Sequence, residues 1–338
     1  MTQIITQIQP NLHSSWQKEL ANVVTDPEKL LTLLEIDPNE YKAHFKARSL
    51  FPVRVPYPFI KKMHKGDFND PLLRQVMPLN QEFDMLAGYS SDPLEEHDTV
   101  AEGLLHKYQH RVLMIVKSGC AINCRYCFRR HFPYQDNSPN KSRWQQALDY
   151  IKVHNEINEV IFSGGDPLMA NDEHLNWLIN AIEQIPHITR LRIHTRMPVS
   201  IPQRITKSFT KMLVSSRLKV VIVFHINHAN EIDPAFKEAI KPLKENGVTL
   251  LNQSVLLKAV NDDASILAQL SEALFEADIM PYYLHLLDKV SGASHFDIEE
   301  SQAIAIVKQL ATIVPGFLMP RLVREIGGEP NKTPINLA

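Results

Sequence analysis

Three cysteines, Cys120, Cys124 and Cys127, lie close together and are the only cysteines in this 338-residue chain. An odd number of thiols in one short segment cannot form a disulfide framework, so the pattern indicates a reducing compartment and a metal site. Three thiolates on one loop can hold three irons of a [4Fe–4S] cluster and leave the fourth iron open, whereas a closed zinc site needs four ligands. Two alternatives stay open here: a zinc site completed by His131 or another histidine, and unligated cysteines.

The elements that would position these cysteines form a repeating pattern from Arg111 onward. Short β-rich runs are separated by amphipathic helical stretches. One such stretch is 231–246, where Asp233-Pro234 predicts the start of the helix. The runs span 111–117, 159–165, 190–195, 219–225, 248–254 and 280–286. Strands that alternate with helices predict a parallel sheet, either a partial barrel of six units or an open doubly wound sheet.

A polar cluster follows each of these runs. The clusters are the cysteine loop, Ser163 to Asp166, His194 to Arg196, His225 with Asn227 and His228, Asn252 to Ser254, and His285 with Asp288. In a (β/α) barrel the active site lies at the carboxyl ends of the strands. The six clusters therefore favour the barrel and predict one shared mouth.

The first third of the chain differs in pattern. Helical patches at about 14–24 and 26–36 precede a proline-rich stretch at 51–59. We expect an α/β protein in three parts: a mostly helical N-terminal extension at 1–105, a partial (β/α)6 TIM-like barrel at 106–314, and a C-terminal segment at 315–338.

Composition excludes several classes of protein. The formal net charge is −2 in a chain with 44% hydrophobic residues, so the bulk positive charge of a duplex-binding protein is missing and no nucleic-acid partner is expected. The longest apolar runs are far shorter than the roughly 18 residues that span a bilayer, so no membrane association is expected. The N-terminus lacks the pattern of a signal peptide. We expect a soluble cytoplasmic protein.

The cysteine motif resembles that of the radical S-adenosylmethionine (SAM) superfamily, since CxxxCxxC follows the first strand and Tyr126 precedes the third cysteine. The resemblance implies a [4Fe–4S] cluster on Cys120, Cys124 and Cys127, with SAM on the open iron. It also implies SAM contacts from a further set of residues: Tyr126, Ser163, Gly164, Gly165, Asp166 and His225.

Over residues from about 92 to 335 the chain resembles, more narrowly, the lysine 2,3-aminomutases. The matching segments are 106–132, 225–232, 252–257 and the tail GGEPNKTP at 327–334. In that family a lysine in a glycine-rich C-terminal loop forms a Schiff base with pyridoxal 5'-phosphate (PLP), which implies this catalytic role for Lys332. The resemblance places Lys107, Tyr108, Arg111 and Gln253 around the same cofactor. Lys107 replaces an arginine that is usual in the lysine-fermenting members.

Substrate contacts follow from the same resemblance. Arg129 is expected to bind the carboxylate of L-lysine, and Asp288 and Glu325 its ε-ammonium. Glu325 is one methylene longer than the usual aspartate, so its reach differs. Acidic residues there favour a cationic side chain and oppose glutamate. The sequence leaves open whether Arg125 and Arg130 are simply solvated.

The short length, the helical extension and Glu325 resemble the bacterial members that supply (R)-β-lysine for the modification of elongation factor P by a separate ligase. Such an isomerase also needs a reductant, such as flavodoxin or ferredoxin. Longer members carry C-terminal cysteines that bind zinc, which this chain lacks, so zinc and the oligomer that uses it are left open. Three alternatives remain: another cationic amino acid, such as ornithine or arginine; fermentative or antibiotic-precursor lysine metabolism; and a non-catalytic iron–sulfur binding module.

Overall fold

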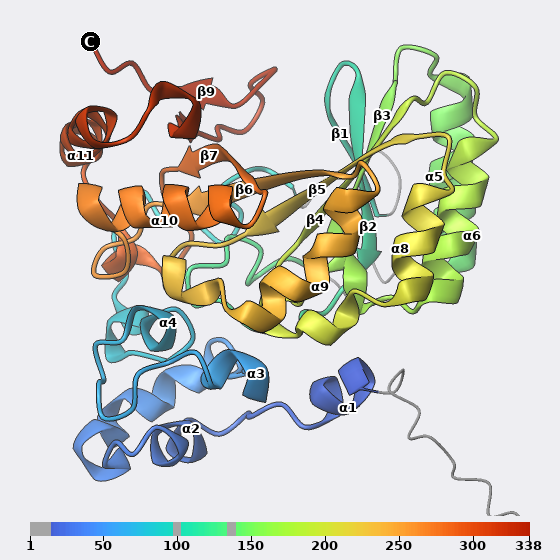
Figure 1. Ribbon diagram of the computed structural model, residues 1–338. Helices are drawn as coiled ribbons and strands as arrows, with labels where there is room; N and C mark the ends of the chain where they lie inside the picture. The colour runs from blue at the N-terminus through green and yellow to red at the C-terminus, as the bar shows by residue number, and fades with distance from the viewer. Residues whose placement is uncertain (1–14, 97–102, 134–139) are drawn as a thin grey trace, which may run out of the picture.

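The computed structural model describes residues 15–96, 103–133 and 140–338 (Figure 1). Within these residues, nine strands form one sheet in the order in which they occur in the chain. They are β1 (Leu104–Tyr108), β2 (Arg111–Lys117), β3 (Glu159–Gly164), β4 (Arg190–Thr195), β5 (Lys219–His225), β6 (Thr249–Val255), β7 (Met280–His285), β8 (Arg321–Arg324) and β9 (Thr333–Pro334). Strands β2 to β8 are parallel, and β1 and β9 are antiparallel at the two edges.

Helices connect the parallel strands and cover the outside of the sheet (Figure 1). They are α5 (Lys141–Val153), α6 (Asp172–Glu183), α7 (Met197–Ser200), α8 (Lys207–Val214), α9 (Pro234–Glu245), α10 (Ala264–Glu276) and α11 (Glu300–Ile313). The first and last strands of the sheet do not pair with each other, so the barrel is open. Six βα units followed by a seventh parallel strand confirm the predicted partial barrel.

The predicted strand bounds agree closely with the structure. Strands β2, β4 and β5 have the predicted ends, β3 and β7 each end one residue earlier than predicted, and β6 is shifted by one residue at both ends. Strands β1, β8 and β9 were not predicted, because each is short and the sequence of β8, RLVR, has no long apolar run. Helix α9 begins as expected: the side chain of Asp233 accepts a hydrogen bond from the amide of Phe236 at 2.9 Å.

The N-terminal extension consists of short helical pieces gathered at one end of the barrel (Figure 1). They are α1 (Ser15–Ala21), α2 (Pro27–Leu33), α3 (Tyr57–Ile60) and α4 (Pro71–Arg74), with 3-10 turns at Pro38–Ser49 and Asn80–Phe83. The two predicted helical patches are present as α1 and α2, and residue 14 lies outside the described residues. None of the helices in the described part of the chain is both long and apolar enough to cross a membrane.

The extension contacts the loops that follow the strands. The amide of Asn123 donates to the carbonyl of Arg54 at 3.0 Å, and Lys62 Nζ donates to the carbonyls of Val199 and Glu231 at 2.8 Å each. These partners come after β2, β4 and β5, so the extension covers the carboxyl ends of those strands. Its buried apolar side chains also join the barrel core in one continuous cluster. The division into three parts remains a prediction.

Candidate active site

The polar clusters after the strands converge on a cavity of about 450 Å³. Most of the predicted site residues line it: Cys120, Cys124, Cys127, Tyr126, Arg129, Ser163, Gly164, Gly165, Asp166, Tyr108, Arg111, His225, Gln253, Glu325 and Lys332. Lys107 and Asp288 are the two predicted residues that are not on this wall, although both interact with groups that are. The volume lies in the range of small-molecule and cofactor sites.

A glycine pair lets the loop after β3 approach the cysteine loop closely. The amide of Gly165 donates to the carbonyl of Lys117 at 2.7 Å. A Cβ atom added to Gly164 would lie 2.2 Å from the carbonyl oxygen of Lys117, and one added to Gly165 would lie 2.5 Å from that of Gly119. Gly164 also has a φ of +130°, which L side chains rarely adopt. The pair therefore has a packing role that the sequence did not indicate.

The carboxylate of Asp166 accepts several hydrogen bonds from the protein itself. Its oxygens accept from Thr195 Oγ1 at 2.7 Å and from the amides of Arg196 at 2.8 Å, Met197 at 2.9 Å and Leu168 at 3.0 Å. Burial raises the pKa of Asp166, and these hydrogen bonds oppose that effect. Asp166 thus joins the loops after β3 and β4 and positions the cavity wall; its predicted contact with SAM stays a prediction.

Arg196 connects the cysteine loop to the N-terminal extension. Its Nη1 donates to Cys124 Sγ at 2.7 Å, and its Nη2 donates to Gln75 Oε1 at 2.7 Å and to Glu231 Oε2 at 2.9 Å. Burial alone would lower the pKa of Arg196, but Cys124 and Glu231 outweigh it and raise the pKa well above the ordinary value. The guanidinium is thus fixed directly against the sulfur of one predicted cluster ligand.

The sequence did not identify Gln75 and Glu231 as partners in this network. Glu231 lies within the segment 225–232 that carries the family resemblance, but its carboxylate had no motif of its own. Gln75 belongs to the extension, 121 residues away from Arg196 in the chain. Contacts of that separation leave no local pattern.

The cysteine loop fits an iron–sulfur cluster better than a single ion. Burial raises the pKa of Cys120 well above its ordinary value, with Asp166 adding to it, and burial with Cys124 nearby raises that of Cys127 to about 11. Cationic irons would offset both effects. Among residues 15–96, 103–133 and 140–338, no three His, Cys, Asp or Glu side chains are arranged to hold one metal ion. A [4Fe–4S] cluster instead takes each thiolate on a different iron.

A zinc site completed by His131 has no support in the geometry. His131 Nε2 lies 3.2 Å from the carbonyl oxygen of Ser291, and the interaction is exposed. The observed hydrogen bond of this ring is therefore with a main-chain carbonyl and not with a cysteine.

Lys332 reaches the cavity from the β8–β9 hairpin, in which Arg324 pairs with Thr333. Its ammonium forms an ion pair with Glu325, whose other oxygen accepts from the hydroxyl of Tyr108 at 3.1 Å. The Arg111 guanidinium lies 3.9 Å from the centroid of the Tyr108 ring. The hairpin thus brings Lys332 beside two of the residues predicted to surround PLP.

The two carboxylates predicted to bind a substrate ammonium have different environments. Burial would raise the pKa of Glu325, but Lys332 and Lys107 outweigh it and lower the pKa below its ordinary value. Burial, together with the charge of Glu325, raises the pKa of Asp288 to about 7. Asp288 Oδ1 is buried and finds no hydrogen-bond partner among the described residues. A ligand cation would satisfy that oxygen.

Three histidines give the cavity an uncharged polar wall: His285 is buried, and His194 and His225 are half-buried. Burial lowers the pKa of His225 to about 3, with Arg196 and Arg129 adding to it, and burial also lowers the pKa values of His194 and His285. Gln253 Nε2 lies 2.8 Å from His225 Nε2.

Several atoms of this wall are left without a partner. Among the described residues, the buried atoms of these side chains that have no hydrogen-bond partner are Gln253 Oε1, His285 Nε2 and His194 Nε2. Because buried polar atoms are normally hydrogen-bonded, the wall fits polar ligands with several donors and acceptors, such as SAM and PLP.

Arg129 is held by a carboxylate that the sequence did not identify. Its Nε donates to Glu96 Oε2 at 2.6 Å, and its Nη1 donates to Ser163 Oγ at 3.0 Å. Lys107 Nζ lies 2.9 Å from Glu96 Oε1, so one carboxylate bridges two predicted ligand-binding cations. Burial would raise the pKa of Glu96, but these cations outweigh it and lower the pKa.

Arg125 and Arg130 are not solvated. Arg125 Nε and Arg130 Nη2 each donate to Glu82 at 2.8 Å, and both side chains are fully buried. They fasten the cysteine loop to the extension.

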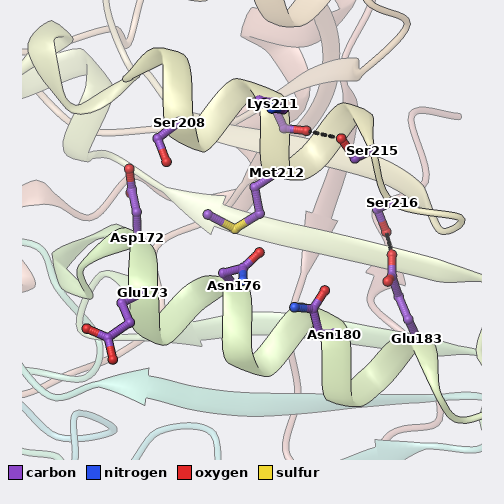
Figure 2. A pocket seen from close by; sticks show the side chains of 10 residues that line it. All are labelled: Asp172, Glu173, Asn176, Asn180, Glu183, Ser208, Lys211, Met212, Ser215 and Ser216. Atoms are coloured by element: carbon purple, nitrogen blue, oxygen red, sulfur yellow. Dashed lines mark hydrogen bonds between the residues drawn. The ribbon is translucent and has the colours of Figure 1, made fainter.

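A second hollow lies between α6 and α8, on the outer helix layer (Figure 2). None of the predicted site residues lines it. Its polar groups pair locally, as in the 2.8 Å hydrogen bond from Ser215 Oγ to the carbonyl of Lys211. The cavity at the carboxyl ends of the strands is therefore the candidate site.

Comparison with known proteins gives consistent matches. The family model described as Radical SAM superfamily matches residues 114–269. The chain is 55% identical over 338 residues to an L-lysine 2,3-aminomutase of Escherichia coli (strain K12), covering 100% of this chain and 98% of the relative. It is 57% identical over 320 residues to one of Haemophilus influenzae, covering 94% and 95%. Identity to one of Clostridium subterminale is 34% over 325 residues, covering 95% and 78%.

Proposed function

The chain belongs to the lysine 2,3-aminomutase family within the radical SAM superfamily, and from that premise we propose that it converts L-lysine to β-lysine with PLP at Lys332. Its family makes it an isomerase whose cofactors include a [4Fe–4S] cluster and SAM. One observation carries the proposal for PLP: Lys332 and the three cysteines line the same cavity, although about 200 residues separate them in the chain.

The cofactors supply the difficult chemistry when bound: a carbon radical that abstracts hydrogen, and a conjugated ring that spreads an unpaired electron. Cys120, Cys124 and Cys127 would hold the cluster, with Arg196 donating to the sulfur of Cys124. Lys332 would hold PLP, with Tyr108, Arg111 and Gln253 along its sides.

The chain would bind lysine by its two charged ends. Arg129, oriented by Glu96, would receive the carboxylate, and Asp288 and Glu325 would receive the ε-ammonium. Two fixed ends place the α and β carbons between them, which supplies orientation at the reacting atoms. In the cofactor-free chain Glu325 is paired with Lys332; if Lys332 holds PLP, this carboxylate would be available to the substrate ammonium.

The extension restricts access of water to this chemistry. Gln75 and Glu82 reach from it to Arg196, Arg125 and Arg130, and all five side chains are buried. A cover fixed in this way would shield the inner cavity from solvent and protect reactive radicals there, while a separate hollow remains between the extension and the cysteine loop.

We further propose that the product is (R)-β-lysine destined for elongation factor P, to which a separate ligase attaches it. The presence of Glu325 supports this branch.

The test is anaerobic reconstitution with iron, sulfide and PLP, followed by chiral analysis of the product formed from L-lysine under reducing conditions. We expect (R)-β-lysine, with ornithine and arginine converted far more slowly. A spectroscopically intact cluster that gives no β-lysine would overturn the proposed reaction. For the second proposal, a strain without this gene should contain elongation factor P lacking the β-lysyl mass, and free β-lysine should restore it.

A further inference from the structure

The cysteine loop forms a wall between two hollows. The inner one is the cavity of about 450 Å³, and a second hollow of about 900 Å³ lies on the other side, between the loop and the N-terminal extension. Cys120, Cys127 and Arg129 line both. The same metal ligands can therefore be approached from two directions.

The two approaches have different uses. The inner cavity would be filled by SAM, PLP and lysine during the reaction. An electron for the cluster must come from a donor outside the chain, and a protein donor cannot share the space that the substrate occupies. The outer hollow provides the separate approach.

The outer hollow is lined by cationic and apolar side chains. Among the described residues that line it are four arginines and no carboxylate. Phe51, Pro52, Val53 and Met169 supply apolar surface beside them. Such a surface is complementary to an acidic partner that also carries an apolar contact patch.

Of the four arginines, Arg48 and Arg54 are the two that a partner could contact. Arg129 and Arg130 are buried against Glu96 and Glu82. Arg48 has 55% of its side chain exposed, and its only ion pair in the described residues is with Asp26 at 3.2 Å, itself 51% exposed. An exposed pair of this kind contributes little, so Arg48 can exchange it for a carboxylate of a partner.

Arg54 lies closer to the cysteines. Its Nη2 donates to the carbonyl of Leu20 at 3.3 Å, while its Nε is buried without a partner among the described residues. Arg54 lines the outer hollow together with Cys120, and its carbonyl accepts from the amide of Asn123 in the cysteine loop at 3.0 Å. The cationic surface thus extends from the exposed rim to the cluster ligands.

We propose that this outer hollow is the docking site of a small acidic electron-transfer protein. The donor binds against Arg48 and Arg54 and gives one electron to the cluster, so the donor is oxidised by one electron and the cluster is reduced by one. The inference rests on the proposed function, because only a cluster that takes part in turnover needs a donor.

The test compares two reductants on reconstituted full-length protein carrying Arg48→Glu. Flavodoxin hydroquinone is the protein donor, and dithionite is a small reductant that needs no docking site. We expect the Kd for flavodoxin to rise about tenfold and flavodoxin-supported SAM cleavage to fall about tenfold, while dithionite-supported cleavage is unchanged. The difference should shrink at high salt, because exposed charges are screened.

Lys211→Glu is the matched control, since it makes the same charge change on the exposed face of α8 (Figure 2). Equal Kd values for the two variants would overturn the docking site. Arg54→Gln provides a second variant closer to the cluster and should weaken flavodoxin binding in the same direction. If dithionite supports no SAM cleavage in the unaltered protein, the proposed function fails, whereas the binding comparison still decides the docking site.

Discussion

Lys332 donates a hydrogen bond to Glu325, its near neighbour across the β8–β9 hairpin, and both side chains are mostly buried. The pair gives a cationic side chain a fixed counter-charge inside the cavity that the cysteines also line. Lys332 and the cysteines come from segments about 200 residues apart in the chain. A substitution at Lys332 can therefore test PLP binding without changing a cluster ligand.

Lys332→Ala should remove the absorbance of the Schiff base with PLP and abolish β-lysine formation, because the amine proposed to bond to the cofactor is gone. Iron content and the cluster spectrum should stay unchanged, since no cysteine contact is lost. Lys308→Ala, on the outer helix α11, is the control and should keep both spectra. Retention of the PLP absorbance in Lys332→Ala would show that another lysine binds the cofactor.

Asp288→Asn should stabilise the cofactor-free protein at high pH. The folded pKa of about 7 lies above the unfolded value, so the ionised carboxylate opposes folding; this penalty is full above pH 7 and lost as the pH falls toward 4. Glu325, Lys332, Glu96 and Lys107 are the charged groups that act on it. We expect a gain of roughly 2–4 kcal/mol in the free energy of unfolding at pH 8.

Urea unfolding of cofactor-free Asp288→Asn at pH 5.5 and pH 8 measures this gain, which should be larger at pH 8. The exposed Asp278→Asn change is the control and should give the same small difference at both pH values. A gain independent of pH would contradict a raised pKa at Asp288. The same variant should bind lysine more weakly, because the ε-ammonium loses a carboxylate.

Glu96→Gln should act on substrate binding. The change removes the charge that orients Arg129 and Lys107, so we expect the KM for lysine to rise about tenfold with a smaller change in kcat. Removing one member of a buried ion pair should also cost about 3 kcal/mol of stability. Glu300→Gln, which breaks an exposed pair with Arg324, is the control. An equal fall in kcat and kcat/KM would instead place Glu96 in the chemical step.

Gly165→Ala should reduce cluster assembly. The new methyl group would lie 2.5 Å from the carbonyl oxygen of Gly119, so the cysteine loop must move. Gly119→Ala is a close control in the same loop, because its methyl group would meet nothing within 4 Å. Iron and sulfide analysis after reconstitution should show a deficit only in Gly165→Ala. Equal iron contents would show that the loop adapts without loss.

The parts of the fold that carry a local signal were predictable. Strands such as β5, KVVIVFH, have an apolar run bounded by polar residues, and the cysteines and the glycine pair follow such runs directly. Strand β8 has four residues and its neighbour β9 has two, so neither run is long enough to show a period. Both depend on pairing with distant strands.

The candidate site likewise contains residues that the sequence predicted and residues that it did not. Cys124 was predicted from the spacing of the three cysteines, and Lys332 from the resemblance of the tail at 327–334 to its family. Glu96 and Gln75 were missed because isolated polar residues have no pattern, and their roles depend on arginines 33 and 121 residues away. Arg125 and Arg130 could not be assigned from the sequence, because their partner Glu82 belongs to the extension.

The β8–β9 hairpin has a consequence for local unfolding. It joins the sheet through β7 alone, and its own pairing is limited to two residue pairs. A short edge element of this kind opens at a lower free energy than the central strands. Amide hydrogen exchange should therefore be faster at 321–334 than in β2 to β5, and release of PLP should follow that opening while the iron–sulfur loop stays folded. Retention of the two cofactors would then be governed by separate cooperative units of the same chain.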